Sequence, residues 1–299
     1  MNREQHAVFS SNHHADPFRH GPRGAGLIDL PIAREVSTEL PIAPGSGIKG
    51  VLREHFRAKQ DQDLVELLFG PERSRADSHS GILCPQDAYL LCLPVRSLKG
   101  TLARVASPLT LQRYAREAKI HNKDQAGKDK SIPDLFDVAR DEVAASETVA
   151  FKPAGWSHHA VGLHELIRKR NDKLEPRREK WADHIAGKFF AADTNWAKVF
   201  KERFVVVADD TMVFLAQMAT DVRARVSLDQ NRVVRKGGNW YEESLPAETL
   251  LWGVMAAQLV RKISIDPEHA LRKLKSETLQ MGGKATIGRG VVEFLIEPI

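Results

Sequence analysis

Two glycine-rich segments carry the residues best suited to binding phosphate. One runs from Pro44 to Arg53 (PGSGIKGVLR) and the other from Gly282 to Gly290 (GGKATIGRG). Glycine lets a backbone approach a phosphate closely, and the N–H groups at the start of a helix favour an anion. The lysine and arginine side chains add positive charge. Each segment therefore predicts an anion site. The alternative is a plain strand-to-helix turn with solvated cations for the first segment and a tight glycine hairpin for the second.

Neither segment is a standard nucleotide fingerprint. The GxxxxGK[ST] spacing of a P-loop is absent, and a dinucleotide-binding GxGxxG needs a helix after it. The residues after Gly290, VVEFLI, are instead typical of a strand. A small-molecule enzyme with nucleotide loops therefore has no recognised cofactor motif here, and a backbone cradle for RNA phosphates is favoured for the second segment. Within it, Gly283 and Gly288 are predicted to need backbone conformations closed to other residues.

A single carboxylate, Asp29, stands in the segment GLIDLPI. Such a group could orient a metal-bound water, hold a cation beside a scissile phosphate or assist a ribose 2′-hydroxyl. A lone aspartate shortly before a proline is also a common turn residue. Spacing alone leaves both interpretations of Asp29 open.

Histidines and cysteines offer a weaker signal for metal chemistry. The histidines fall into two sets, His13, His14 and His20, and His158, His159 and His164. No carboxylate or cysteine completes either set at a recognised metal spacing, so solvated loop histidines compete with a metal site. Cys84 and Cys92 do not form a CxxC pair, which argues against a cysteine-rich zinc site and against a disulfide framework.

The elements that must position these residues alternate irregularly, which predicts an α+β fold. Apolar residues over 48–56 recur with a helical period, and Ser46 stands where the helix N-cap is expected. Residues 81–105 are predicted to form strands. Residues 222–241 alternate with period two on both sides of a turn, which predicts a β-hairpin.

The charge balance is mildly basic. The 299 residues include 44 Lys and Arg against 39 Asp and Glu, which is a weak pointer to a polyanionic partner. The densest basic run, 168–180, either follows a phosphate backbone or forms a solvated helix face. No signal-peptide core and no apolar stretch of about 18 residues is present, so a cytoplasmic protein without a membrane span is predicted.

Five blocks of sequence resemble, in the same order, the RAMP (repeat-associated mysterious protein) superfamily of CRISPR proteins. The resemblance is greatest to the backbone subunit of type III-B (Cmr) effector complexes. The blocks are IDLPIARE (28–35), PIAPGSGIKG (41–50), LPVRSLKGT (93–101), GNWYEESLP (238–246) and LQMGGKATIGRG (279–290). The N-terminus departs from the family pattern, because His14 is not followed by a compact glycine turn.

The resemblance implies a ferredoxin-like or RRM-like palm with insertions and a β-hairpin thumb. The expected organisation is a single domain over residues 1–299, with insertions at about 106–200 and the thumb at about 222–241. The implied partners are a guide CRISPR RNA, a complementary target RNA, other copies of the chain in a filament and other effector-complex subunits. Guide–target pairing would select the target, and the implied role is antiviral defence.

The resemblance also implies that each copy cuts the target RNA at regular intervals, by attack of a ribose 2′-hydroxyl with Mg²⁺ or Mn²⁺ present. Asp29 matches the family's cleavage aspartate, and His14 is a candidate active-site neighbour. The RNA-binding candidates are Gly45, Ser46, Gly47, Lys49, Arg53, Lys99, Gly282, Gly283, Lys284, Thr286, Gly288 and Arg289. Two alternatives are a structural backbone subunit without cleavage activity and a guide-RNA-processing RAMP endonuclease that cuts through histidine.

Overall fold

The structure, a computed structural model, describes residues 3–11, 28–59, 62–72, 74, 79–121, 132–258, 260, 272 and 274–297. The chain divides into two compact units, residues 1–89 with 220–298, and residues 90–219. Strands and helices are mixed in both units, which confirms the predicted α+β class. His14, the candidate active-site neighbour, lies outside the described residues.

The first unit is built on an antiparallel sheet with the strand order β13-β14-β1-β12. These strands are β1 (Arg3–Ser11), β12 (Leu250–Ala257), β13 (Glu277–Gln280) and β14 (Val291–Glu297). β1 lies between β12 and β14, with Val8 opposite Trp252 and Leu295. β1 extends on both sides beyond its apolar residues 7–9, because backbone pairing also recruits the polar residues on either side.

Two helices and two short strands belong to the same unit. They are β2 (Ile42–Ala43), α1 (Gly45–Ala58), α2 (Gln62–Phe69) and β3 (Leu83–Pro85). α1 buries Ile48, Leu52 and Phe56, whose spacing of four places them on one face of the helix, as predicted. The prediction that Ser46 is the N-cap is wrong. The N-cap is Pro44, two residues earlier, and the helix begins at Gly45; the fixed φ of proline suits the residue that precedes a helix.

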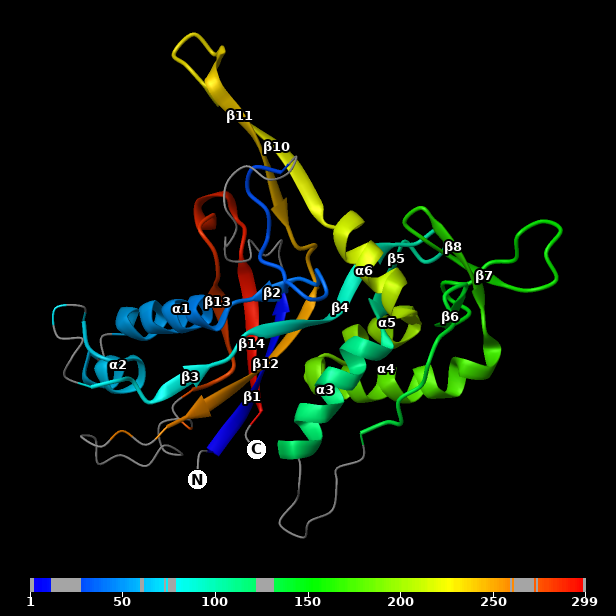
Figure 1. Cartoon of the computed structure of the whole chain (residues 1–299), viewed down its shortest axis with the longest axis horizontal. Helices are drawn as coiled ribbons and strands as arrows, with labels where there is room; N and C mark the ends of the chain where they lie inside the picture. Colours follow the sequence, from blue (N-terminus) through cyan, green and yellow to red (C-terminus); the bar gives the residue numbers. More distant parts are fainter. Residues whose placement is uncertain are drawn as a thin grey trace. The chain divides into compact units, whose positions relative to one another are not determined.

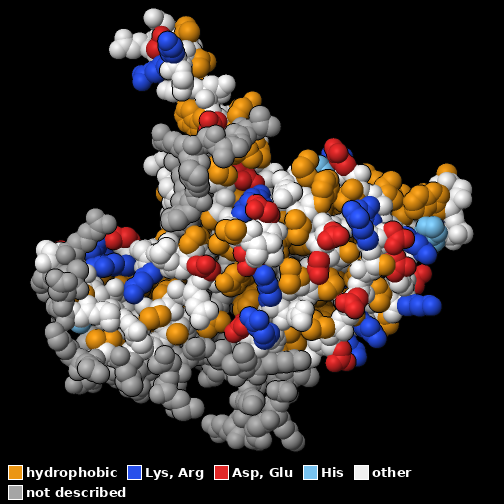
Figure 2. All heavy atoms as spheres, in the orientation of Figure 1, with side chains coloured by type: hydrophobic (Ala, Val, Ile, Leu, Met, Phe, Trp, Pro, Cys, Tyr) orange, Lys and Arg blue, Asp and Glu red, His pale blue; other side chains and the backbone are white. Residues whose placement is uncertain are grey.

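The predicted hairpin is present and projects from the first unit (Figure 1). It consists of β10 (Asp221–Leu228) and β11 (Val234–Ser244), which are antiparallel. The Asp229 carboxylate accepts hydrogen bonds from the backbone of Asn231 and Val233, which closes the turn. Figure 2 shows basic and hydrophobic side chains together on this hairpin. Val222, Val226 and Leu228 alternate along β10 and are exposed.

The second unit contains a mixed sheet with the strand order β4-β5-β9-β6-β8-β7. Its strands are β4 (Ala88–Arg96, whose first two residues belong to the first unit), β5 (Leu102–Ala106), β6 (Glu142–Ala145), β7 (Ala160–Leu163), β8 (Leu166–Arg170) and β9 (Phe204–Val207). Its helices are α3 (Pro108–His121), η2 (Asp172–Leu174), α4 (Glu175–Phe189), α5 (Thr194–Arg203) and α6 (Asp209–Met218). The predicted strands at 81–105 are thus confirmed as β3, β4 and β5.

The basic run at 168–180 falls on β8, η2 and the start of α4. Arg170 is buried and donates to the carbonyl of Ala145, and Arg178 is buried and paired with Glu175 at 2.8 Å. These two cations therefore support packing within the second unit. Among the described residues, no helix has the length and apolar character needed to cross a membrane.

Candidate nucleic-acid interface and cleavage site

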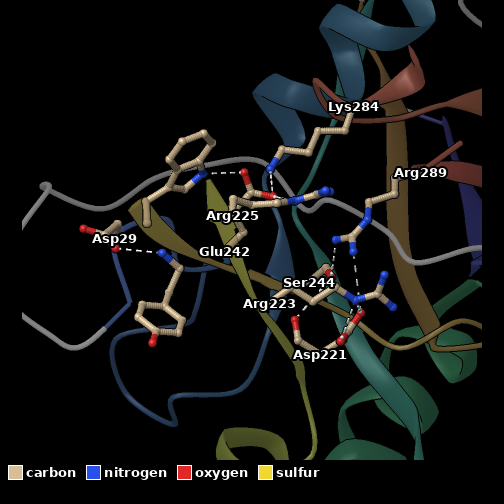
Figure 3. A network of polar contacts seen from close by, with 10 residues as sticks. Asp29, Asp221, Arg223, Arg225, Glu242, Ser244, Lys284 and Arg289 are labelled. Atoms are coloured by element: carbon tan, nitrogen blue, oxygen red, sulfur yellow. Dashed lines mark hydrogen bonds and ion pairs between the residues drawn. The ribbon is translucent and has the colours of Figure 1, made fainter. Parts of the chain in front are cut away.

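Asp29 lies beside the base of the hairpin. Leu30 forms a parallel bridge with Glu242 of β11, so the segment that carries Asp29 adds a short extra strand to the edge of β11 opposite β10. One carboxylate oxygen of Asp29 accepts the N–H of Tyr241 at 2.8 Å (Figure 3). The Asp29 side chain is exposed, and its second oxygen has no hydrogen-bond partner among the described residues. The carboxylate is therefore oriented by the backbone but remains accessible.

A polar network lies next to Asp29 at the base of the hairpin (Figure 3). Its centre is the buried Glu242, which pairs with Lys284 and accepts hydrogen bonds from Arg225 at 3.2 Å and Trp240 at 2.7 Å. Burial by itself raises the pKa of Glu242, but the three donors outweigh burial and lower the pKa to about 2. Glu242 is therefore ionised throughout the neutral range.

The glycine turn at 282–290 owes its shape to three left-handed residues. Gly282, Gly288 and Gly290 have φ values of +91°, +71° and +79°, a region that side chains other than glycine rarely adopt. The prediction for Gly288 is confirmed. The prediction for Gly283 is wrong, because its φ is not in this region and a Cβ there would meet nothing within 4 Å. The turn reverses through Gly282, which leaves Gly283 in ordinary backbone geometry.

The two cations of this turn point into the chain. The side chain of Lys284 is 13% exposed and pairs with Glu242. Arg289 is 5% exposed, donates to Ser244 at 3.0 Å and lies 3.8 Å from the carboxylate of Asp221. Their charges are neutralised by the base of the hairpin. Thr286, by contrast, is exposed on the outer side of the turn.

The start of α1, residues 45–53, holds its cations differently from the turn at 282–290. Gly45 is buried, and its N–H is already bound by the carboxylate of Asp87 at 2.8 Å, so part of the expected anion site is occupied by the chain itself. Ser46 is exposed in the first turn. Lys49 and Arg53 follow on α1 without a carboxylate partner among the described residues, and burial lowers the pKa of Lys49. Arg53 donates to the carbonyl of Pro71.

The RAMP superfamily model matches residues 20–293 of this chain. The chain belongs to the RAMP superfamily. A relative from Pyrococcus furiosus, the CRISPR system Cmr endoribonuclease Cmr4, is 30% identical over 282 residues, which cover 92% of this chain and 90% of the relative. The resemblance inferred from the five blocks is confirmed by both matches.

Solved structures of other proteins have the same fold. The crystal structure of oligomeric Cmr4 from Pyrococcus furiosus superposes with a TM-score of 0.69 and 24% identity, over 99% of this chain and 98% of the other. The cryo-EM structure of type III-B Cmr-beta bound to cognate target RNA gives a TM-score of 0.68 and 16% identity, over 99% of this chain and 97% of the other. The predicted RAMP palm with a hairpin thumb is therefore confirmed as the fold.

Two RNA-binding candidates of this RAMP protein remain. Gly47 lies in the first turn of α1, where its N–H donates to the carbonyl of Pro44 at 2.9 Å, and Lys99 lies in the second unit. Lys99 is exposed in the bend that follows β4, and its ammonium donates to the backbone carbonyl of Glu147 at 2.8 Å. Gly100 and Thr101 beside it have positive φ, which turns the chain sharply into β5. The Lys99 charge has a carbonyl partner but no carboxylate partner among the described residues.

The described residues do not form a resident metal site. No three His, Cys, Asp or Glu side chains within the described ranges lie close enough to share an ion. Asp29 offers one carboxylate, of which one oxygen is engaged by Tyr241. Mg²⁺ usually keeps several waters and binds through one or two carboxylates together with substrate phosphates, so Asp29 could hold such an ion only together with the RNA.

Sequence reasoning missed two functional supports in this RAMP chain, Glu242 and Glu243. Both belong to the block GNWYEESLP, which indicated the family but gave no separate role to either residue. A pair of adjacent acidic residues inside an alternating strand is itself a signal, because successive side chains point to opposite faces. Two buried carboxylates on opposite faces of β11 require two separate sets of donors.

Proposed function

We propose that this chain is a repeating guide-RNA-binding backbone subunit of a type III-B (Cmr) CRISPR ribonucleoprotein, and that it cleaves complementary target RNA at regular intervals. Its membership of the RAMP superfamily and its similarity to Cmr4 support this role. The partners in this proposal are the guide CRISPR RNA, the target RNA, further copies of the chain and other subunits of the complex, in antiviral defence.

We infer that Asp29 is the catalytic residue. The observation that carries this inference is an exposed carboxylate held by the backbone of β11, directly beside the hairpin that would contact the guide–target duplex. In the proposed reaction the ribose 2′-oxygen attacks the adjacent phosphorus and the bond to the 5′-oxygen breaks. The accessible oxygen of Asp29 accepts a hydrogen bond from the attacking 2′-hydroxyl and orients it. The 2′-hydroxyl gives up its proton to solvent as the new P–O bond forms, and the departing 5′-oxygen takes up a proton from solvent, so the products are a 2′,3′-cyclic phosphate and a 5′-hydroxyl.

We infer that the RNA backbone is bound chiefly by Lys49, Arg53 and Lys99, since these cations have no carboxylate partner among the described residues. Exposed Ser46, Gly283 and Thr286 offer further polar contacts. Lys284 and Arg289 act on RNA indirectly, through the shape of the turn that they hold. The turn glycines would contribute backbone groups at short range.

The test is cleavage of a complementary target by the assembled, guide-loaded complex that contains Asp29→Ala or Asp29→Asn. We expect the cleavage rate to fall by about 100-fold or more, with target affinity unchanged. Asp137→Asn is the matched control, because Asp137 is also exposed and lies in the second unit. Unchanged cuts in the Asp29 variants would leave the chain as a structural subunit without cleavage activity. Omission of Mg²⁺ and Mn²⁺ in parallel tests the predicted metal dependence.

A further inference from the structure

The segment that carries Asp29 is attached to the hairpin through a side chain as well as through its backbone. Leu30 donates to the carbonyl of Tyr241 at 3.1 Å and accepts from the N–H of Glu243 at 3.0 Å. These backbone bonds reach only as far as Leu30. Ile32, two residues later, has no backbone acceptor on β11, and its N–H is bound instead by the Glu243 carboxylate at 3.1 Å.

Glu243 binds three donors from two other parts of the first unit, the segment that carries Asp29 and the entry of the hairpin. One carboxylate oxygen accepts the N–H of Ile32, and the other accepts the guanidinium of Arg34 at 2.5 Å and the hydroxyl of Thr220 at 2.8 Å. Thr220 immediately precedes β10, and Glu243 itself lies near the end of β11. One carboxylate thus joins the entry of the hairpin, its exit and the Asp29 segment.

The burial of Glu243 makes these bonds necessary. Glu243 is 4% exposed, and a buried carboxylate is strongly destabilised unless donors replace the water that it has lost. If the donors moved away, the buried charge of the Glu243 carboxylate would be unpaired. The Asp29 segment is therefore held to the base of the hairpin by a cluster that resists local opening.

We propose that Glu243 is a positioning residue, which holds the segment that carries Asp29 in place relative to the hairpin. When the hairpin contacts RNA, the Asp29 carboxylate is then held in a fixed orientation toward that RNA. This inference rests on the proposed catalytic role of Asp29. Glu243 itself lies in the protein interior and acts through the segment 29–34. Its neighbour Glu242 points to the other face of β11 and holds the turn at 282–290 instead.

Glutamine at position 243 tests the proposal with a minimal change in volume. An amide has one acceptor oxygen, whereas Ile32 and Arg34 bind different oxygens of Glu243. Glu243→Gln therefore leaves one of these two donors facing an NH₂ group, and the anchor of the Asp29 segment is lost on one side. The substitution leaves the two backbone hydrogen bonds of Leu30 in place, so we expect the variant to fold.

The experiment measures target affinity and the single-turnover cleavage rate separately in the assembled, guide-loaded complex. For Glu243→Gln we expect a cleavage rate about tenfold lower, because a small displacement of a reacting group is costly, with target affinity within about twofold of wild type. Glu277→Gln is the matched control, since Glu277 also bridges two segments, through His55 of α1 and Lys59 directly after that helix, and contacts neither the segment 29–34 nor the hairpin among the described residues. We expect it to cut at the wild-type rate.

Two further variants separate positioning from general destabilisation. In the Asp29→Asn background, Glu243→Gln is expected to add no further loss of rate, because the two residues act as one unit. Arg34→Lys retains the charge but loses the guanidinium geometry, and we expect a partial loss of rate. Arg34→Lys also tests the positioning role of Glu243 if the Glu243→Gln chain does not assemble into the complex.

The outcomes are distinguishable. If Asp29→Ala abolishes cutting while Glu243→Gln and Arg34→Lys cut at the wild-type rate, the positioning role is wrong and the proposed function stands. If Asp29→Ala cuts normally, the proposed catalytic role fails and the positioning role fails with it. A loss of rate in Glu243→Gln that simply adds to that of Asp29→Asn would also overturn the proposal.

Discussion

The turn at 282–290 and the start of α1 at 45–53 have similar sequences, rich in glycine with a lysine and an arginine each, yet they hold these cations in opposite ways. Lys284 faces the carboxylate of Glu242, inside a network that also includes the hairpin. Lys49 has no such partner among the described residues, and burial lowers its pKa. The charge of Lys284 is therefore neutralised within the chain, whereas the charge of Lys49 has no carboxylate partner among the described residues.

This difference indicates two uses of one sequence pattern. A buried cation that is paired within the chain holds elements together, and its loss leaves an unpaired partner. A cation without a carboxylate partner gains more from an external phosphate. We therefore expect substitutions in the 282–290 turn to act on stability, and substitutions on α1 to act on RNA affinity.

The largest expected effect is that of Gly290→Ala. Gly290 has φ +79°, and a Cβ there would lie 1.9 Å from the carbonyl oxygen of Met281. Backbone on both sides must shift, and we expect a loss of more than about 3 kcal/mol in the free energy of unfolding. Gly283→Ala is the control in the same turn, where a Cβ meets nothing within 4 Å. Equal denaturation midpoints for the two variants would contradict this account.

Glu242→Gln is expected to have the next largest effect, and the effect depends on pH. The folded pKa of about 2 is below the usual glutamate pKa of 4.5, so folding stabilises the ionised form. That stabilisation, on the order of 3 kcal/mol, is complete above about pH 5 and is lost as the pH falls towards 2. Unfolding measured from pH 7 to pH 2 should show wild type and Glu242→Gln converging. A constant difference would sink this interpretation.

The smallest expected effect distinguishes the two turns by salt dependence. Purified chain is titrated with a single-stranded RNA of guide length at several salt concentrations. Arg53→Gln should remove about one phosphate contact and reduce the slope of log affinity against log salt by about 0.7. Lys284→Gln should leave the slope unchanged, because that charge is already neutralised by Glu242. The reverse order would show that the second turn is the RNA contact.

Much of the fold follows from local pattern. The period of Ile48, Leu52 and Phe56 predicted α1, and alternation along 222–241 predicted the hairpin. The limits of elements were less predictable. β1 extends into polar residues, since its length is set by pairing with β12 and β14 rather than by its own side chains.

The site was predicted in part. The sequence identified Asp29 as a catalytic candidate, and the structure shows it exposed at the base of the hairpin. It did not indicate that Glu242 and Glu243 would support this region, since their donors are up to 211 residues away in the chain. Such long-range pairs leave no periodic signal in a single sequence.

The sequence by itself determined the family, the α+β class and the hairpin, because each depends on local order and on motifs that can be read residue by residue; the same motifs made Asp29 a candidate. Only the tertiary structure decided which cations are neutralised and which are not. The charge of Lys284 and that of Arg53 are the same in the sequence. What separates them is the position of Glu242, which depends on burial and on the close approach of segments distant in the chain.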